Sequence, residues 1–211
     1  MASPPATPAS EPGAPKDPRK LIALGAGLVA VVLGAVVVFG GSGRKEEFAQ
    51  RQLANARASA EMGDLPTAAS GFQTIIQTYD GTRAAAEATI GLNQVRLING
   101  QNELAVTGIR EFIASKPDRE FLAPAYGLLG AALENAAKPA DAAEAYRNAA
   151  EAADVDYLKA SYLVEVGRAL TTAGQRDEAA QVYRDVVARY PETPMTTEAK
   201  VRLAELTAGR M

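Results

Sequence analysis

A repeat of 37 residues constrains what most of this chain can fold into. Alanine recurs at this interval, at Ala68, Ala105, Ala142 and Ala179. Four residues after each alanine stands a large apolar side chain, in turn Phe72, Ile109, Tyr146 and Tyr183. Apolar residues at this spacing share one face of a helix. Because a lone helix pair cannot bury such a face, the period predicts a stack of helix pairs.

The same period marks the turns and the helix ends. Five residues before each alanine stands a small residue suited to a turn, in order Gly63, Gly100, Ala137 and Gly174. Twelve residues after it stand helix-terminating residues, Asp80, Pro117, Asp154 and Pro191. We therefore expect pairs near 49–82, 86–119, 123–156 and 160–193, and a solvating cap over 194–208. The fold class is all-α, since no segment shows the alternation of a strand.

The composition excludes much of enzyme chemistry. The chain has no cysteine, histidine or tryptophan, so it lacks thiol nucleophiles, disulfides and the commonest metal ligand and neutral-pH base. Its acidic pairs lie early in predicted helices, where the helix dipole favours them. We expect no catalytic residue, no metal, no cofactor and no small-molecule substrate. The net charge of -3, without basic runs, also argues against nucleic-acid binding.

The first 41 residues have a different character from the repeats. Residues 1–20 are rich in proline and predict a disordered tail. The run from Leu21 to Phe39 carries no charged side chain and is long enough to cross the roughly 30 Å apolar core of a bilayer. A secretory signal peptide is the rival reading, but its apolar region is usually about 7–15 residues long. We therefore predict a single transmembrane anchor over 21–41 and a repeat domain over 42–211.

The predicted anchor carries a strip of small residues four apart, at Ala26, Ala30 and Gly34. Such a strip lets another membrane helix approach closely, although plain lipid-facing packing explains it equally well. Basic residues flank the anchor on both sides, so the positive-inside rule leaves its orientation open.

The repeat pattern resembles the tetratricopeptide repeat, most clearly in YGLLGAALENAAKPADAAEAYRNAA and LVEVGRALTTAGQRDEAAQVYRDVVARYP. The usual repeat of that family is about 34 residues long. The resemblance implies a right-handed α-solenoid whose first helices line a groove for peptides or partner helices. The candidate groove residues are Leu53, Arg57, Ile90, Gln94, Leu97, Ile98, Glu134, Val164, Arg168 and Thr171.

Some of these residues also have an alternative role that involves no ligand. Leu97 or Ile98 would serve equally as core between the second and third pairs. For Arg57 and Arg168 a role as solvated charges is favoured over one as ligand clamps. The lysine and asparagine clamp that some family members use for peptide carboxylates is absent from the matching positions. A mixed, partly apolar groove remains.

The tail, the anchor and a stack ending in YRDVVARYPETPMTTEAKVRLAEL together resemble the bacterial ancillary SecYEG translocon subunit family, which shares its repeat class with the Tol-Pal cell-division coordinator. This implies an inner-membrane protein with periplasmic repeats and with translocon subunits, periplasmic chaperones or unfolded clients as partners. We expect a chaperone-like or adaptor subunit. The alternatives are a structural scaffold of an envelope or cell-division complex and an adaptor that faces the cytoplasm.

Overall fold

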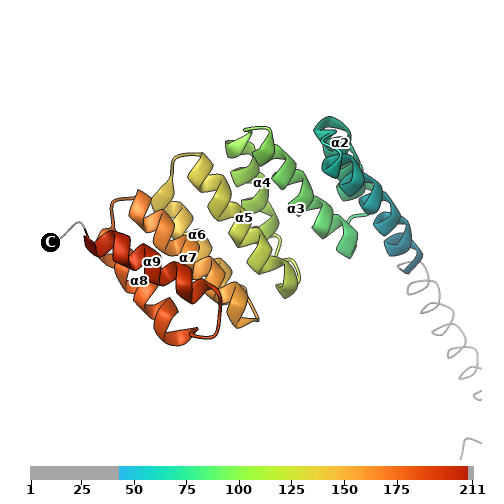
Figure 1. The fold of residues 1–211 in the computed structure, drawn as a ribbon. Coiled ribbons are helices and arrows are strands. Elements are labelled where there is room, and N and C mark those ends of the chain that lie inside the picture. Colours follow the sequence, from blue (N-terminus) through green and yellow to red (C-terminus); the bar gives the residue numbers. More distant parts are fainter. Residues whose placement is uncertain (1–42, 209–211) are drawn as a thin grey trace, which may run out of the picture. The chain divides into compact units, whose positions relative to one another are not determined.

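The structure, a computed structural model, describes residues 43–208. These residues form helices joined by short turns (Figure 1). Apart from the first two residues of the first helix, the helix pairs belong to one compact unit, Lys45–Met211. The all-α class predicted from the sequence is confirmed for the described residues, which contain no strand. The predicted tail, the anchor and its strip of small residues at Ala26, Ala30 and Gly34 lie outside the described part.

Consecutive helices form antiparallel pairs that follow one another along the domain (Figure 1). The first pair joins a helix over residues 43–61 to α2 (Leu65–Thr78). The second pair is α3 (Arg83–Ile98) with α4 (Asn102–Ala114). After a short 3-10 turn, η1 (Arg119–Phe121), the third pair is α5 (Leu122–Asn135) with α6 (Pro139–Ala152). The fourth pair is α7 (Asp156–Thr172) with α8 (Arg176–Arg189), and α9 (Met195–Ala208) closes the stack.

The helix pairs begin earlier than the sequence suggested, at residues 43, 83, 122 and 156 rather than 49, 86, 123 and 160. The 37-residue pattern locates the central turns of each helix but not its first residue. In α3 this turn is capped by Thr82, whose hydroxyl oxygen accepts a hydrogen bond from the Ala85 N–H at 3.1 Å.

The turn inside each pair has the same backbone geometry. The residue at the turn has a positive φ in all four pairs, at Gly63 (80°), Gly100 (72°), Ala137 (57°) and Gly174 (81°). The following N–H donates to the carbonyl five residues earlier, as from Asp64 to Ser59 at 2.9 Å and from Lys138 to Leu133 at 2.8 Å. This is a Schellman ending, which glycine adopts without steric cost and alanine does not. The small residues predicted as turns therefore lie in turns.

The repeated alanines form the centre of the core. All four are fully buried, and so are the large apolar residues that follow them by four positions, each of which is at most 4 % exposed. The buried apolar residues fall into two clusters. One extends from Ala49 to Val95 and the other from Ala105 to Leu206, so the division lies between α3 and α4.

Among the helices of residues 43–208, none is long and apolar enough to span a bilayer.

Candidate functional site

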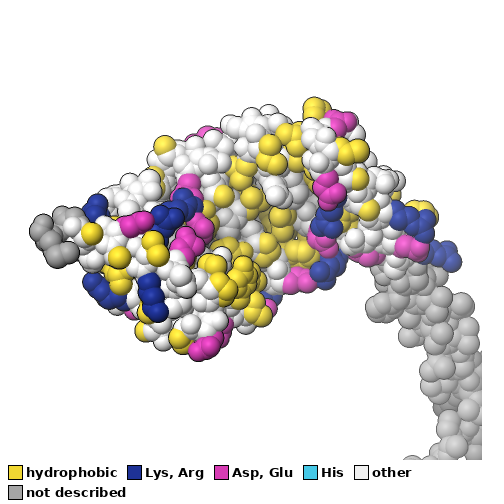
Figure 2. Space-filling model, viewed as in Figure 1, with side chains coloured by type: hydrophobic (Ala, Val, Ile, Leu, Met, Phe, Trp, Pro, Cys, Tyr) yellow, Lys and Arg dark blue, Asp and Glu magenta, His cyan; other side chains and the backbone are white. Residues whose placement is uncertain are grey.

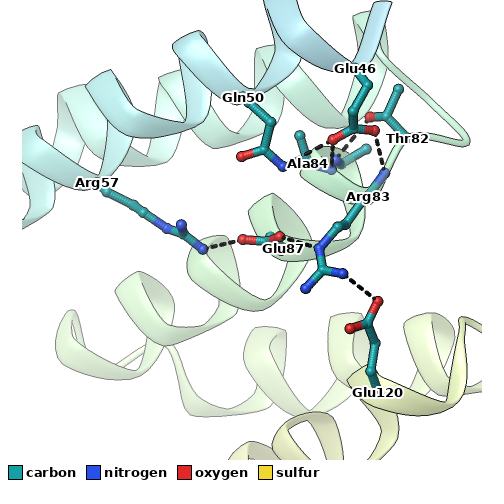
Figure 3. A network of polar contacts seen from close by, with 9 residues as sticks. Glu46, Gln50, Arg57, Thr82, Arg83, Ala84, Glu87 and Glu120 are labelled. Atoms are coloured by element: carbon teal, nitrogen blue, oxygen red, sulfur yellow. Dashed lines mark hydrogen bonds and ion pairs between the residues drawn. The ribbon is translucent and has the colours of Figure 1, made fainter. Parts of the chain in front are cut away.

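The first helices of neighbouring pairs are joined by ion pairs along one side of the stack (Figure 3). Glu87 on α3 lies at the centre of this network. Its carboxylate accepts a hydrogen bond from Arg57 of the preceding pair at 2.6 Å and from Arg83 at 3.0 Å. Arg83 also reaches Glu120, just before α5, at 2.8 Å. The network therefore connects three successive pairs.

Glu87 is held in its ionised form by this network. Its side chain is only 18 % exposed, and burial by itself opposes ionisation. Hydrogen bonds and charge from Arg57 and Arg83 outweigh the burial, so the pKa of Glu87 lies below its ordinary value. The carboxylate stays charged at neutral pH and fixes the position of the Arg57 side chain.

Next to Glu87 is a hollow of about 390 Å³ between the first and second pairs. Phe72 is one of its lining residues, and its ring is only 2 % exposed because it packs directly against Gly91 of α3, which has no side chain. A Cβ atom at Gly91 would lie 2.8 Å from that ring. The remaining lining residues are Arg57, Ala60, Glu61, Glu87, Ile90, Gln94, Val95 and Ile98. The hollow thus combines apolar lining residues with a rim of charged and amide groups.

A second polar cluster lies on the third and fourth pairs. Glu134 of α5 accepts a hydrogen bond from the Tyr146 hydroxyl at 2.9 Å and from Arg168 of α7 at 2.6 Å. Arg168 is desolvated by burial, but its hydrogen bonds to Glu134 and Glu165 outweigh that effect and raise its pKa. Burial, reinforced by the charge of Glu134, raises the pKa of Tyr146. At neutral pH Tyr146 is therefore neutral and Arg168 is charged.

A smaller hollow of about 250 Å³ adjoins this second cluster. It is lined by Arg168, Thr171, Thr172, Arg176, Tyr183, Arg202, Glu205 and Leu206. Figure 2 shows that charged side chains gather near α3 and again near α7 and α9, with largely uncharged surface over α5 between them. The candidate surface therefore has two polar regions separated by a less polar one.

The structure divides the ten predicted groove residues into three groups. Four line the larger hollow, namely Arg57, Ile90, Gln94 and Ile98. Three belong to the second polar cluster or its hollow, namely Glu134, Arg168 and Thr171. The other three, Leu53, Leu97 and Val164, pack with core residues.

Two of these assignments are corrected by burial. Leu53 is fully buried and Val164 is 3 % exposed, so neither presents a side chain to a groove. Leu53 packs in the amino-terminal core cluster and Val164 in the carboxy-terminal one. Of the two residues left open between groove and core, Leu97 is partly buried against the core, whereas Ile98 is 64 % exposed.

Several residues of the larger hollow were not foreseen from the sequence. Phe72 was assigned to the core, which is correct, but the close packing of its ring on Gly91 was not foreseen. Glu87 was also missed. A signal for it exists, because Glu87 lies one helical turn before Ile90 and two turns before Gln94 and so shares their face of α3.

The arrangement offers binding groups rather than reacting ones. In residues 43–208 no cluster of three potential metal ligands occurs. The perturbed groups of the site are a carboxylate and arginines paired with each other, and tyrosines held neutral by burial. Such a surface can hold a peptide by apolar contact and hydrogen bonds.

Helix pairs that stack on one another and expose their first helices along one side define a helical-repeat interaction domain. The chain belongs to the family described as the tetratricopeptide repeat-like domain, which it matches over residues 35–168. A further match to the tetratricopeptide repeat covers residues 162–193. The resemblance to the tetratricopeptide class is thereby confirmed, while the closer resemblance to translocon subunits and the cell-division coordinator stays a prediction.

Solved structures share the fold at low sequence identity. The crystal structure of MamA protein is 18% identical with a TM-score of 0.61, over 78% of this chain and 83% of that chain. Putative kinesin light chain repeats of Podosopora anserina are 18% identical with a TM-score of 0.64, over 76% and 86%. YrrB, described as a tetratricopeptide protein with an unusual peptide-binding site, is 17% identical with a TM-score of 0.57, over 75% and 76%. Comparison with curated protein sequences finds no match.

Proposed function

We propose that this protein is a membrane-anchored interaction module at the bacterial secretion translocon. Its anchor over residues 21–41 holds the repeat domain at the periplasmic face of the inner membrane, and its groove receives extended apolar segments of client or partner proteins. The membrane and translocon parts of this proposal rest on the sequence. The binding of protein segments rests on the repeat fold and on the hollow between the first two pairs.

The hollow between the first two pairs is the observation that carries the binding proposal. Its volume of about 390 Å³ is large enough for one or two apolar side chains. Ile90 and the exposed Ile98 supply apolar surface to the hollow, so an inserted side chain meets apolar groups there. Burial of this surface would favour binding by about 25 cal/mol for each Å² removed from water.

The rim of the hollow supplies polar partners for a peptide backbone. The exposed Gln94 amide can both donate and accept hydrogen bonds, which an extended backbone requires. Arg57 is already fixed by Glu87 at 2.6 Å, so less conformational entropy is lost when a peptide binds beside it. Neither group selects a particular side chain of the bound peptide. The groove is therefore suited to many apolar segments. The similar fold of YrrB, described as having a peptide-binding site, supports this use of the surface.

Site-specific photocrosslinking in cells tests the proposal. A photoreactive amino acid at Gln94 faces the hollow, and one at Val201 on α9, which is 52 % exposed, serves as the control. We expect the probe at Gln94 to capture translocon subunits, periplasmic chaperones and many secreted chains. The Ile98→Glu variant should lose these products, and the matched Val201→Glu variant should retain them.

The other functions give different crosslinks. A single envelope partner captured in constant proportion would favour the structural scaffold. Cytoplasmic partners alone would overturn the periplasmic orientation. Equal capture from Gln94 and Val201 would contradict a specific role of the hollow.

A further inference from the structure

The beginning of α7 exposes three large apolar side chains in four successive positions. Val155 is 53 % exposed, Tyr157 is 51 % and Leu158 is 39 %. Figure 2 shows hydrophobic side chains gathered near the edge where α7 begins. Single exposed apolar residues are common on protein surfaces, but a contiguous group marks a contact surface. We call Val155, Tyr157 and Leu158 the α7 patch.

The repeat itself does not require the α7 patch. The positions equivalent to Tyr157 in the earlier pairs hold charged residues, Glu46, Arg83 and Glu120. These form a ladder between pairs, in which the Glu46 carboxylate accepts a hydrogen bond from the Arg83 N–H at 2.8 Å (Figure 3). Arg83 in turn pairs with Glu120 at 2.8 Å. In the fourth pair the same position holds the aromatic ring of Tyr157 in place of a charged group.

Leu158 also differs from its equivalent in the preceding pair. Phe121 occupies that position and is only 6 % exposed, because Phe112 packs against its ring edge-on and the Arg83 guanidinium lies over its face. Leu158 remains much more exposed than Phe121. The apolar character of the α7 patch is therefore not explained by packing within the domain.

The α7 patch lies on the edge of the domain where the first helix of every pair begins. The ladder from Glu46 through Arg83 to Glu120 follows this edge, and Arg119 continues it to Asp154 at 3.2 Å. The helix that begins at residue 43 starts on the same edge. We call it the starting edge.

The apolar run predicted to cross the bilayer ends close to the starting edge in sequence. Phe39 is its last residue, and only Gly40, Gly41 and Ser42 separate it from residue 43. A fully extended chain advances at most about 3.6 Å per residue, so this connection spans no more than roughly 14 Å. An anchor that ends at Phe39 would therefore keep the first-pair end of the starting edge near the membrane surface.

We propose that the starting edge faces the bilayer and that the α7 patch inserts into its interfacial layer. This proposal rests on the membrane anchor of the proposed function. Tyrosine is favoured at the level of the lipid headgroups, where its ring is apolar and its hydroxyl remains hydrated. Because the anchor already holds the domain at high effective concentration near the surface, three side chains suffice for a stable contact. The repeat groove would then keep a fixed orientation above the membrane.

Charge contributes little to this contact. Lys116, Arg119 and Lys159 near the α7 patch are balanced by Asp118, Asp154 and Asp156. Electrostatic attraction to anionic lipid needs an excess of basic residues, which is missing here. The contact should therefore form on zwitterionic lipid and should change little with salt.

A single fluorescent label tests the proposal in the full chain, which contains no natural cysteine. The Val155→Cys variant, labelled with an environment-sensitive dye, is reconstituted into phosphatidylcholine vesicles with or without brominated lipid. The control is Ile98→Cys, at the far end of α3 and 64 % exposed. We expect brominated lipid to quench the label at 155 strongly and the label at 98 hardly at all. Adding the Tyr157→Asp and Leu158→Asp substitutions should abolish the quenching at 155.

Flotation of the same vesicles separates the possible failures. A chain that does not float with the vesicles would overturn the anchor and this proposal with it. A chain that floats while its label at 155 stays unquenched would overturn the lipid contact alone. Protection of that label in native membranes, but not in pure lipid, would assign the α7 patch to a protein partner and equally overturn the lipid contact.

Discussion

The second and third helix pairs follow the same 37-residue pattern, yet their helices cross differently. We call the residue of the first helix that meets the second helix of its pair at close range the crossing position. In the third pair this residue is Gly130 on α5, and a Cβ atom there would lie 2.5 Å from the Tyr146 ring. In the second pair the equivalent position is Asn93, which is 1 % exposed and faces Gly108 on α4. The glycine therefore lies on the first helix in one pair and on the second helix in the other.

A buried asparagine lies where the apolar core is divided, between α3 and α4. The Asn93 amide donates to the Thr89 carbonyl at 2.8 Å and accepts from Arg96 at 3.0 Å. These contacts satisfy the polar group, but they place hydrogen bonds where the third pair has aromatic packing. The second and third pairs thus differ in how their two helices meet, one through a hydrogen-bonded amide and the other through an aromatic ring.

Exchanging the crossing residue in the third pair should have the largest effect. Gly130→Asn would force a side chain into the Tyr146 ring and bury an amide among apolar groups. We expect a loss of about 3–5 kcal/mol in the free energy of unfolding, combining overpacking with an unsatisfied polar group. Urea unfolding followed by circular dichroism measures it, with Ala131→Asn at the half-buried neighbouring position as control. An unchanged midpoint would show that the crossing is not tightly packed.

Removing the amide in the second pair should have a smaller effect. Asn93→Ala eliminates the hydrogen bonds to Thr89 and Arg96, and we expect a loss of about 1–2 kcal/mol in the free energy of unfolding. The exposed neighbour Gln94→Ala should stay within about 0.5 kcal/mol of the wild type. Hydrogen exchange should rise mainly in α3 and α4. A more stable Asn93→Ala variant would mean that the polar crossing opposes folding.

Alkaline pH distinguishes the two pairs through Tyr146, whose equivalent in the second pair is Ile109. The raised pKa of buried Tyr146 means that the unfolded chain loses its proton first, so stability falls as pH rises past about 10. Tyr146→Phe should cost about 1 kcal/mol at neutral pH and reduce this alkaline loss. Chemical unfolding from about pH 8 to about pH 11 measures the slope. The exposed Tyr157→Phe serves as control, and an identical slope in both variants would contradict the assignment.

Acid pH should reveal the smallest effect, at the Glu87 network of the second pair. Because Arg57 and Arg83 lower the pKa of Glu87 against the opposing effect of burial, its contribution is present above the ordinary carboxylate pKa of about 4.3. It is lost as pH falls through the lower pKa of the folded state. Glu87→Gln should cost less than about 1 kcal/mol at pH 7, since both arginines are more than half exposed.

The difference between Glu87→Gln and the wild type should vanish at low pH. Thermal unfolding across the acid range measures this, and Glu61→Gln on the rim of the same hollow is the matched control. A constant difference at all pH values would show that the substitution acts through packing rather than charge.

The groove residues show that the sequence predicts the repeat position of a residue but not its exposure. Leu53, Ile90 and Val164 occupy equivalent repeat positions and received the same prediction. The structure buries Leu53 and Val164 and leaves Ile90 half-buried in the hollow. Their exposure depends on the side chains that neighbouring pairs place beside them, and the 37-residue period carries no information about that.

The sequence by itself determined the local elements and their inward faces. The fully buried Ala68, Ala105, Ala142 and Ala179 follow directly from a periodic pattern, because residues four apart share one face of a helix. Only the tertiary structure decided that the Phe72 ring packs on Gly91 and that Asn93 faces Gly108. It also decided that α7 begins with an exposed apolar patch. Each of these depends on side chains from different helices meeting in space, and their fit is set by volume and hydrogen bonding rather than by spacing along the chain.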